Sequence, residues 1–225
     1  MLLHIPEVFT KTQVAELRAA LDAGAWLDGA ATAGPLAAKA KYNLQFSTES
    51  PGYPALSQAI ISALEQHPLF VSAALPQRIL PPMFNRYALG NTYANHVDNA
   101  IQTDRRDGER VRTDISVTVF LSEPEEYEGG ELIVEDTYGS HEVKLPAGDA
   151  IIYPSSSLHR VEPVISGERV ASFLWVQSLV RDAWQRSMLF NLDMNLIKLR
   201  SQIGNTDEIV ALTGHYHNLL RQWSS

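Results

Sequence analysis

A histidine and an aspartate separated by one residue, His96 and Asp98, are the residues of this sequence best suited to chemistry. Alternate residues of a β-strand point to the same face, so a strand here would present an imidazole and a carboxylate side by side. His159 offers a second imidazole, and Arg169 follows it ten positions later. Two histidines and one carboxylate bound facially leave three metal positions open, as in non-heme Fe(II) oxygenases. The pattern therefore predicts an iron-dependent oxygenase.

The elements that must position these residues fall into three zones. We expect an N-terminal helical support region over residues 1–75, a β-rich core over residues 76–181 and a C-terminal helical extension over residues 182–225. In the first zone, Thr10 and Gln13 form a capping box before an apolar stripe that stops at Gly24. A second helix is expected over residues 54–66. Between the helices, residues 28–41 are rich in Ala and Gly and are expected to form a loop.

The middle zone has the alternation of β-strands. Residues 114–121 place Ile and Val on one face and Ser116, Thr118 and Phe120 on the other, and residues 131–135 predict another short strand. Turn signals recur at Gly129-Gly130, Gly139-Ser140, Ala147-Gly148-Asp149 and Ser166-Gly167. Their spacing favours a sandwich or jelly roll over alternating strands and helices, so the expected fold class is α+β with a mainly β core.

The last zone returns to helical spacing. Asp182 can cap an apolar run that ends at Gly204, and Thr206 can cap a second run. We expect the apolar stripes of both helices to pack against the core or across the seam of a homodimer.

Composition limits the partners. The 225 residues are 45% hydrophobic, and 18 basic against 26 acidic residues give a net charge of -8. Without a basic stripe, nucleic acid is not an expected partner, and no segment approaches the ~20 apolar residues of a membrane span. The chain has no cysteine, so a metal must be held by nitrogen and oxygen ligands. These features, and an N-terminus that does not resemble a secretion signal, predict a cytoplasmic protein.

A series of short motifs runs through the middle zone: Arg86-Tyr87, Gly90, Tyr93, His96-Val97-Asp98, Glu128-Gly129-Gly130-Glu131-Leu132, Gly148-Asp149, His159 and Arg169. Together they resemble the Fe(II)- and 2-oxoglutarate-dependent dioxygenases of the prolyl 4-hydroxylase-like branch. The closer resemblance is to the bacterial PKHD-type hydroxylases, some of which are associated with iron uptake. It covers nearly the whole chain and is strongest over residues 80–180. It implies a double-stranded β-helix, or jelly roll, in which His96, Asp98 and His159 bind Fe2+.

The resemblance also implies a site for 2-oxoglutarate. Arg169 would bind the distal carboxylate of this co-substrate through a bidentate pair. Tyr87 matches a family tyrosine whose hydroxyl reaches the same carboxylate, and Trp175 matches an aromatic residue that shapes the pocket. Ser116 stands where relatives often have threonine and keeps the hydroxyl.

Spacing adds a constraint on the fold. If Ser166-Gly167 made a flat hairpin, Arg169 would lie roughly 16 Å along the strand from His159, at ~3.3 Å per residue. A five-carbon diacid cannot bridge that distance. The strands that carry His159 and Arg169 must therefore lie in facing sheets or be strongly coiled.

The reaction implied is hydroxylation of a substrate by dioxygen, with decarboxylation of 2-oxoglutarate to succinate. L-ascorbate is an expected auxiliary reductant. The substrate would be a small molecule, such as an iron-chelating metabolite, or an amino-acid side chain. The charged segment 99–112 is a candidate lid because it is polar and follows the metal-binding pair directly.

Two other functions use the same residues. A cupin-like metalloenzyme would use the three ligands without 2-oxoglutarate, and a noncatalytic sensor would bind iron or 2-oxoglutarate without turnover. A normal 2-oxoglutarate requirement after Arg169→Ala would favour the first alternative. Oxygen-dependent succinate release that His96→Ala abolishes would exclude the second.

Overall fold

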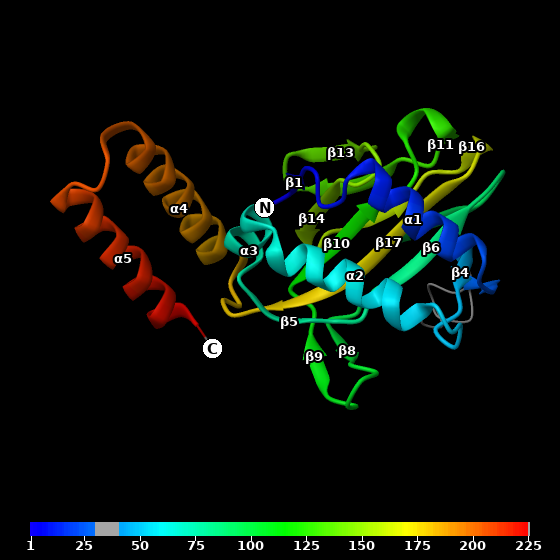
Figure 1. Ribbon diagram of the computed structural model, residues 1–225, viewed down its shortest axis with the longest axis horizontal. Helices are drawn as coiled ribbons and strands as arrows, with labels where there is room; N and C mark the ends of the chain where they lie inside the picture. The colour runs from blue at the N-terminus through cyan, green and yellow to red at the C-terminus, as the bar shows by residue number, and fades with distance from the viewer. Residues whose placement is uncertain (30–40, 225) are drawn as a thin grey trace.

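The computed structural model of the protein describes residues 1–29 and 41–224. Two antiparallel sheets face each other and enclose the middle of the molecule, while helices cover the outer face of the larger sheet (Figure 1). In spatial order, the larger sheet contains β1 (Leu3–Ile5), β14 (Ala150–Pro154), β10 (Ile115–Phe120), β17 (Arg169–Ser178), β6 (Met83–Tyr87), β4 (Leu44–Phe46) and β2 (Trp26–Asp28), and β5 (Pro76–Ile79) pairs with β17.

The smaller sheet contains, in spatial order, β13 (Gly139–Val143), β12 (Leu132–Asp136), β15 (His159–Val161), β7 (Thr92–His96) and β3 (Lys41–Tyr42). Two further strand pairs are β11 (Tyr127–Gly129) with β16 (Val164–Gly167) and β8 (Ile101–Thr103) with β9 (Arg110–Arg112). A short 3-10 helix, Pro124–Glu126, precedes β11. This arrangement is the predicted jelly roll. It places the His159 strand and the Arg169 strand in different sheets, as the spacing of the two residues requires.

The alternation predicted for residues 114–121 is present in β10. Ile115, Val117, Val119 and Leu121 belong to the core beneath the helices, whereas Phe120 belongs to the core between the sheets. Ser116 and Thr118 line a cavity between the sheets. Because side chains alternate along a strand, one face of β10 packs under the helices and the other lines the cavity between the sheets.

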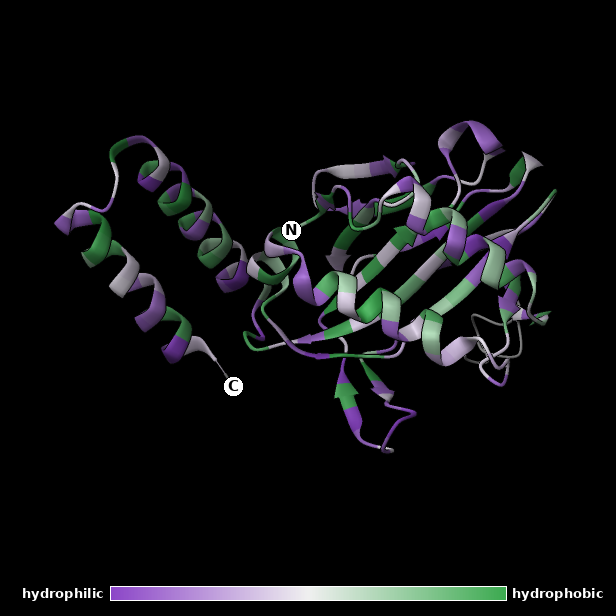
Figure 2. Ribbon diagram, viewed as in Figure 1, coloured by the Kyte–Doolittle hydropathy of each residue, from purple (hydrophilic) through white to green (hydrophobic). Residues whose placement is uncertain are grey.

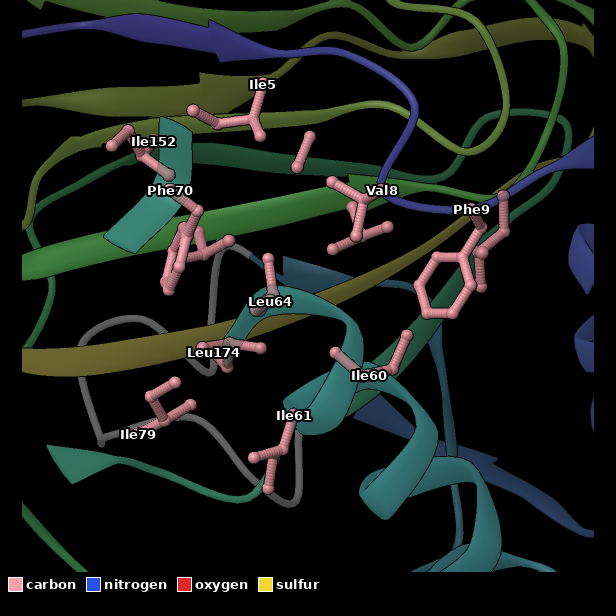
Figure 3. Close-up of a cluster of buried hydrophobic side chains, with 14 of the residues drawn as sticks. Ile5, Val8, Phe9, Ile60, Ile61, Leu64, Phe70, Ile79, Ile152 and Leu174 are labelled. Atoms are coloured by element: carbon pink, nitrogen blue, oxygen red, sulfur yellow. The ribbon is translucent and has the colours of Figure 1, made fainter. Parts of the chain in front are cut away.

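Three helices cover the larger sheet: α1 (Lys11–Asp22), α2 (Tyr53–Gln66) and α3 (Pro68–Ala74). The capping box of Thr10 and Gln13 is confirmed at the start of α1. Figure 3 shows Ile60 and Leu64 on the side of α2 that faces the sheet, and they are buried in one cluster with Ile152 and Leu174.

The N-terminal zone contains more than the predicted helices. Strands β1, β2, β3 and β4 all come from residues 1–75 and extend both sheets. They are two or three residues long, so they show no periodicity of their own and are fixed by distant partners such as β14 and β7. Helix α3 was not expected after the helix predicted over residues 54–66; Pro68 is its first residue, a position that proline favours. Most of the loop expected over residues 28–41 lies outside the described residues.

Two helices at the C-terminus form a hairpin at one end of the molecule: α4 (Ala183–Ile203) and α5 (Asp207–Trp223) (Figure 1). Asp182 and Thr206 cap them, and Gly204 ends the first, as predicted. The hairpin contacts the body beside α3, where Ser72 Oγ donates to Asp193 Oδ2 at 2.5 Å. Both helices also carry apolar residues that stay exposed, among them Trp184, Met188, Ile197, Ile203 and Val210 (Figure 2). Packing across a homodimer stays a prediction, as do the zone boundaries at residues 75 and 181.

No helix among the described residues is long and apolar enough to cross a membrane. The turn expected at Gly139-Ser140 is displaced, because Gly139 already begins β13 and the turn falls on the two residues before it.

Candidate active site

His96, Asp98 and His159 meet at one point of the smaller sheet. His96 ends β7, His159 begins β15, and the two residues lie directly opposite each other in the antiparallel ladder. Asp98 follows two residues after His96, and its Oδ2 lies 3.8 Å from His159 Nε2. One potential ligand atom from each residue lies within 4.8 Å of the others, and no second such group occurs in the described part of the chain. The predicted pattern thus forms a compact facial set of two nitrogens and one oxygen.

Backbone hydrogen bonds set the tautomer of both imidazoles. His96 Nδ1 lies 2.8 Å from the carbonyl oxygen of Ala94, and His159 Nδ1 lies 3.0 Å from that of Ser157. A carbonyl only accepts, so each Nδ1 must carry the proton and donate it. The Nε2 lone pairs of both rings then remain for a metal ion.

The charge state of His96 also suits a ligand. Burial, together with the neighbouring His159, lowers the pKa of His96 to about 4. Only the neutral imidazole can bind a metal ion, so His96 is in its binding form at neutral pH without competition from protons.

The carboxylate of Asp98 is held by a chain of two hydroxyls. Ser116 Oγ lies 2.5 Å from Asp98 Oδ2 and 2.8 Å from Ser155 Oγ. Ser116 has a single hydroxyl proton, which the carboxylate requires, so Ser155 must donate to Ser116. The chain therefore points from Ser155 through Ser116 to Asp98. The hydroxyl of Ser116 thus orients the Asp98 carboxylate, and its expected contact with the co-substrate stays a prediction.

Arg169 and Tyr87 form the closed end of the cavity. They are paired across β17 and β6, and each is 1% exposed. The guanidinium lies 5.4 Å from the Tyr87 ring centre and 5.3 Å from that of Phe120. Nε and Nη1 of Arg169 are buried and have no hydrogen-bond partner among the described residues. Leaving such donors unsatisfied is costly, so this end of the cavity fits an anionic ligand with two oxygens.

Tyr87 is suited to donate to the same anion. Burial raises the pKa of Tyr87 to about 12, against the opposing effect of Arg169. Its hydroxyl therefore stays protonated at neutral pH.

A cavity of about 660 Å³ joins the triad to Arg169. All seven residues predicted for the site line it: Tyr87, His96, Asp98, Ser116, His159, Arg169 and Trp175. Tyr93, one of the motif residues of the middle zone, is also on its wall and stacks on His96 at 3.6 Å between ring centres.

Other lining residues were not found from the sequence. Asn85 lies two residues before Tyr87 on β6, so strand alternation could have found it. Tyr153 packs edge-on against His159, with ring centres 5.2 Å apart, and lies two residues before Ser155. Lys41 gave no signal, because it reaches the cavity from a two-residue strand far away in sequence.

The candidate lid, residues 99–112, contains the β8–β9 hairpin, which projects from the body (Figure 1). Asp104, the first residue of the loop that joins β8 to β9, is fully buried and accepts hydrogen bonds from Arg78 and Arg106. Asn99 and Gln102 line the cavity. The charged residues therefore anchor the hairpin beside the cavity mouth.

The donor set and the buried Arg169 nitrogens fit Fe2+ and 2-oxoglutarate, and comparison with known proteins agrees. Residues 82–177 match the 2OG-Fe(II) oxygenase superfamily, and residues 183–225 match the PKHD-type hydroxylase C-terminal domain. A PKHD-type hydroxylase of Hyphomonas neptunium is 59% identical over 224 residues, covering 100% of this chain and 99% of the relative. One from Herminiimonas arsenicoxydans is 57% identical over 224 residues, covering 100% of both chains.

Solved structures share the fold at low identity. A Pseudomonas putida prolyl-4-hydroxylase aligns with a TM-score of 0.59 and 20% identity over 78% of this chain and 92% of that chain. The viral collagen prolyl hydroxylase from Paramecium Bursaria Chlorella virus-1, solved with 2-oxoglutarate, aligns with a TM-score of 0.55 and 19% identity over 79% and 96%. Both confirm the jelly roll. With the full-length similarity to curated relatives, these findings show that this chain belongs to the PKHD-type hydroxylase family of 2OG-Fe(II) oxygenases.

Proposed function

We propose that the protein hydroxylates a C–H bond of a small molecule or an amino-acid side chain, with dioxygen as oxidant and 2-oxoglutarate as co-substrate. The observation that carries the proposal is one cavity, lined at one position by His96, Asp98 and His159 and at its closed end by Arg169. A metal-binding set and a buried anion site in one space suit a reaction that decarboxylates a diacid beside a metal.

In this proposal each residue has a defined task. His96 and His159 bind Fe2+ through Nε2, and Asp98 binds it through a carboxylate oxygen oriented by Ser116. When bound, the iron supplies the oxygen activation and electron transfer that no side chain here can provide.

Arg169 and Tyr87 hold the distal carboxylate of 2-oxoglutarate. Because both side chains are buried, their hydrogen bonds to the diacid form away from water, where hydrogen bonds are stronger. Phe120, Phe173 and Trp175 provide apolar surface around that end of the cavity and along its wall. The protein's contribution is to fix the diacid and to limit access of water to the metal.

Purified protein supplied with Fe2+ and 2-oxoglutarate tests the function. We expect oxygen-dependent release of succinate, lost in His96→Ala and Asp98→Ala. Binding of iron and 2-oxoglutarate without succinate would favour the sensor, and turnover indifferent to Arg169→Ala would favour the cupin-like alternative.

Three further expectations belong to this proposal. The resemblance to a group associated with iron uptake supports a role there. L-ascorbate is expected to extend turnover by keeping the iron reduced. A cytoplasmic location is expected, because the chain has no cysteine and needs ferrous iron.

A further inference from the structure

The cavity contains a second cationic side chain that the proposed reaction does not use. Lys41 lies on β3 at the edge of the smaller sheet, is 4% exposed and lines the cavity with the triad. Its Nζ donates to Gln45 Oε1 at 3.1 Å. Lys41 is therefore held in place by β4 of the opposite sheet and spans the space between the two sheets.

Aromatic rings frame the ammonium group. Lys41 Nζ lies 5.5 Å from the ring centre of Tyr93 and 5.7 Å from that of Phe173. Tyr93 stacks in turn on His96, so a single ring separates the ammonium from a metal ligand. Cation–π contacts stabilise the charged form where water is scarce.

Lys41 remains a cation at neutral pH. Burial lowers its pKa to about 8, and the carboxylate of Asp28 opposes this effect. A buried cation on the wall of a cavity attracts an anionic group of a ligand in that cavity.

Asn85 provides a second, independent observation. It is 7% exposed, lines the same cavity, and its Oδ1 has no hydrogen-bond partner among the described residues. A buried amide oxygen is normally hydrogen-bonded, so an unpaired one on a cavity wall points to a ligand that carries a hydrogen-bond donor. Asn85 lies on β6 between Met83 and Tyr87, which share its strand face.

The strand register separates this position from the 2-oxoglutarate site. Arg169 pairs with Tyr87, and Phe173 pairs with Met83. Phe173 is four residues beyond Arg169, which is roughly 13 Å along the strand at ~3.3 Å per residue. A five-carbon diacid spans at most ~6 Å between its end carbons, at ~1.5 Å per bond. A diacid anchored on Arg169 therefore ends short of the Phe173 level, where Lys41 lies.

We propose that Lys41 forms a second anion subsite that binds a carboxylate of the primary substrate, and that Asn85 Oδ1 accepts a hydrogen bond from a donor group of the same molecule, so that the substrate is a small organic acid. The inference rests on the proposed function and narrows it. Only the ring of Tyr93 would separate a carboxylate bound to Lys41 from His96. The rest of the substrate would extend along the apolar wall of the cavity toward the triad.

The test uses benzoate as the anionic probe and benzamide as its neutral counterpart. Full-length protein is loaded with Mn2+ and 2-oxoglutarate, and probe binding is followed by paramagnetic relaxation of the probe's ring protons. We expect wild type to bind benzoate at least tenfold more tightly than benzamide. Lys41→Met and Lys41→Gln should weaken benzoate binding at least tenfold and change the Kd for 2-oxoglutarate less than twofold. Lys41→Arg should keep most of the benzoate affinity, and the exposed Lys198→Met is the control for lost charge.

Three results would overturn the subsite: equal benzoate affinity in wild type and the two neutral variants, no preference of wild type for benzoate over benzamide, or loss of 2-oxoglutarate affinity in Lys41→Gln. The last result would assign Lys41 to the co-substrate. Thermal unfolding of each variant identifies misfolding, and Lys41→Gln keeps a hydrogen-bonding group of similar reach if Lys41→Met does not fold. Failure of wild type to bind 2-oxoglutarate with Mn2+ would overturn the proposed function itself, and the substrate assignment with it.

Discussion

Arg169 lies directly opposite Tyr87 in the ladder between β17 and β6, with its guanidinium 5.4 Å from the phenol ring centre. The pair closes one end of the cavity with several hydrogen-bond donors and almost no exposure. This is the arrangement expected for a carboxylate held away from water.

Substitution of Arg169 should therefore affect the co-substrate and spare the metal. Arg169→Lys keeps the charge but loses the planar fork, and we expect the Kd for 2-oxoglutarate to rise about tenfold. Arg169→Ala should raise it by about a hundredfold or more, since each tenfold step is about 1.4 kcal/mol. Calorimetry with Mn2+-loaded protein measures both constants. A matching loss of Mn2+ affinity would show that Arg169 supports the fold of the triad instead.

Removal of the Ser116 hydroxyl should loosen the metal site. Without its donor, Asp98 loses the bond that orients its carboxylate, and such supporting contacts are worth about 10–100-fold in metal affinity. We expect Ser116→Ala to weaken Co2+ binding by about tenfold and to alter its visible d–d spectrum, and Ser116→Thr to restore both.

Ser155→Ala is the companion variant, because Ser155 donates to Ser116 and not to Asp98. It should weaken Co2+ binding less than Ser116→Ala does. An unchanged Co2+ spectrum in Ser116→Ala would show that the hydroxyl chain does not position the carboxylate.

Gly167 should be intolerant of a side chain. Its φ of +73° is left-handed, and a Cβ there would lie 2.0 Å from the carbonyl oxygen of Glu126. We expect Gly167→Ala to destabilise the protein by about 2 kcal/mol or more, as measured by urea unfolding. Gly214→Ala in α5 is the control: its Cβ would meet nothing within 4 Å, and an alanine in a helix should stabilise by up to about 1 kcal/mol. Equal effects at the two glycines would show that neither the left-handed backbone nor the close carbonyl oxygen constrains Gly167.

Asp104 should stabilise the β8–β9 hairpin in a pH-dependent way. Burial alone would raise the pKa of Asp104, but hydrogen bonds from Arg106 and Arg78 outweigh it and hold that pKa well below its usual value. A carboxyl whose folded pKa is depressed stabilises the fold above its unfolded pKa of about 4, and that stability is lost as the pH falls toward the folded pKa.

We expect Asp104→Asn to lower the free energy of unfolding by about 2 kcal/mol at pH 7, and the difference from wild type to shrink as the pH falls below 4. Asp107→Asn, in the same network but half-exposed, should lower the free energy of unfolding less than Asp104→Asn does. Urea unfolding at several pH values measures both. A difference independent of pH would mean that the charge of Asp104 is not what holds the hairpin.

Local signals predicted much of this fold. The capping residues Thr10, Asp182 and Thr206 start helices where expected, because a cap depends on neighbours in sequence. The grouping of His96 with Asp98 was also predictable from their spacing, although β7 ends at His96 and Asp98 follows it outside the strand. Long-range pairing was not: β3 is two residues long, and its position depends on β7, about fifty residues away.

The site residues also divide into those that local sequence spacing indicates and those that depend on long-range contacts. Asn85 shares a strand face with Tyr87 and was within reach of periodicity arguments. The role of Ser116 was not, because its partner Asp98 is separated from it by the β8–β9 hairpin and only the folded chain brings them to 2.5 Å. Residue type indicated a hydroxyl group in the site, and the structure shows that this hydroxyl donates to Asp98.

The triad and the guanidinium belong to opposite walls, β7 and β15 on one and β17 on the other. The distance that the diacid must span therefore depends on the separation of the two sheets. Packing between the sheets sets this separation, and it involves Phe120, Val134 and Ile151. Replacing Val134 or Ile151, neither of which lines the cavity, with a smaller residue would loosen the packing between the two sheets. The same changes would also alter the distance between the triad and Arg169. The packing of the core between the sheets therefore fixes whether one diacid can reach both the metal and the guanidinium.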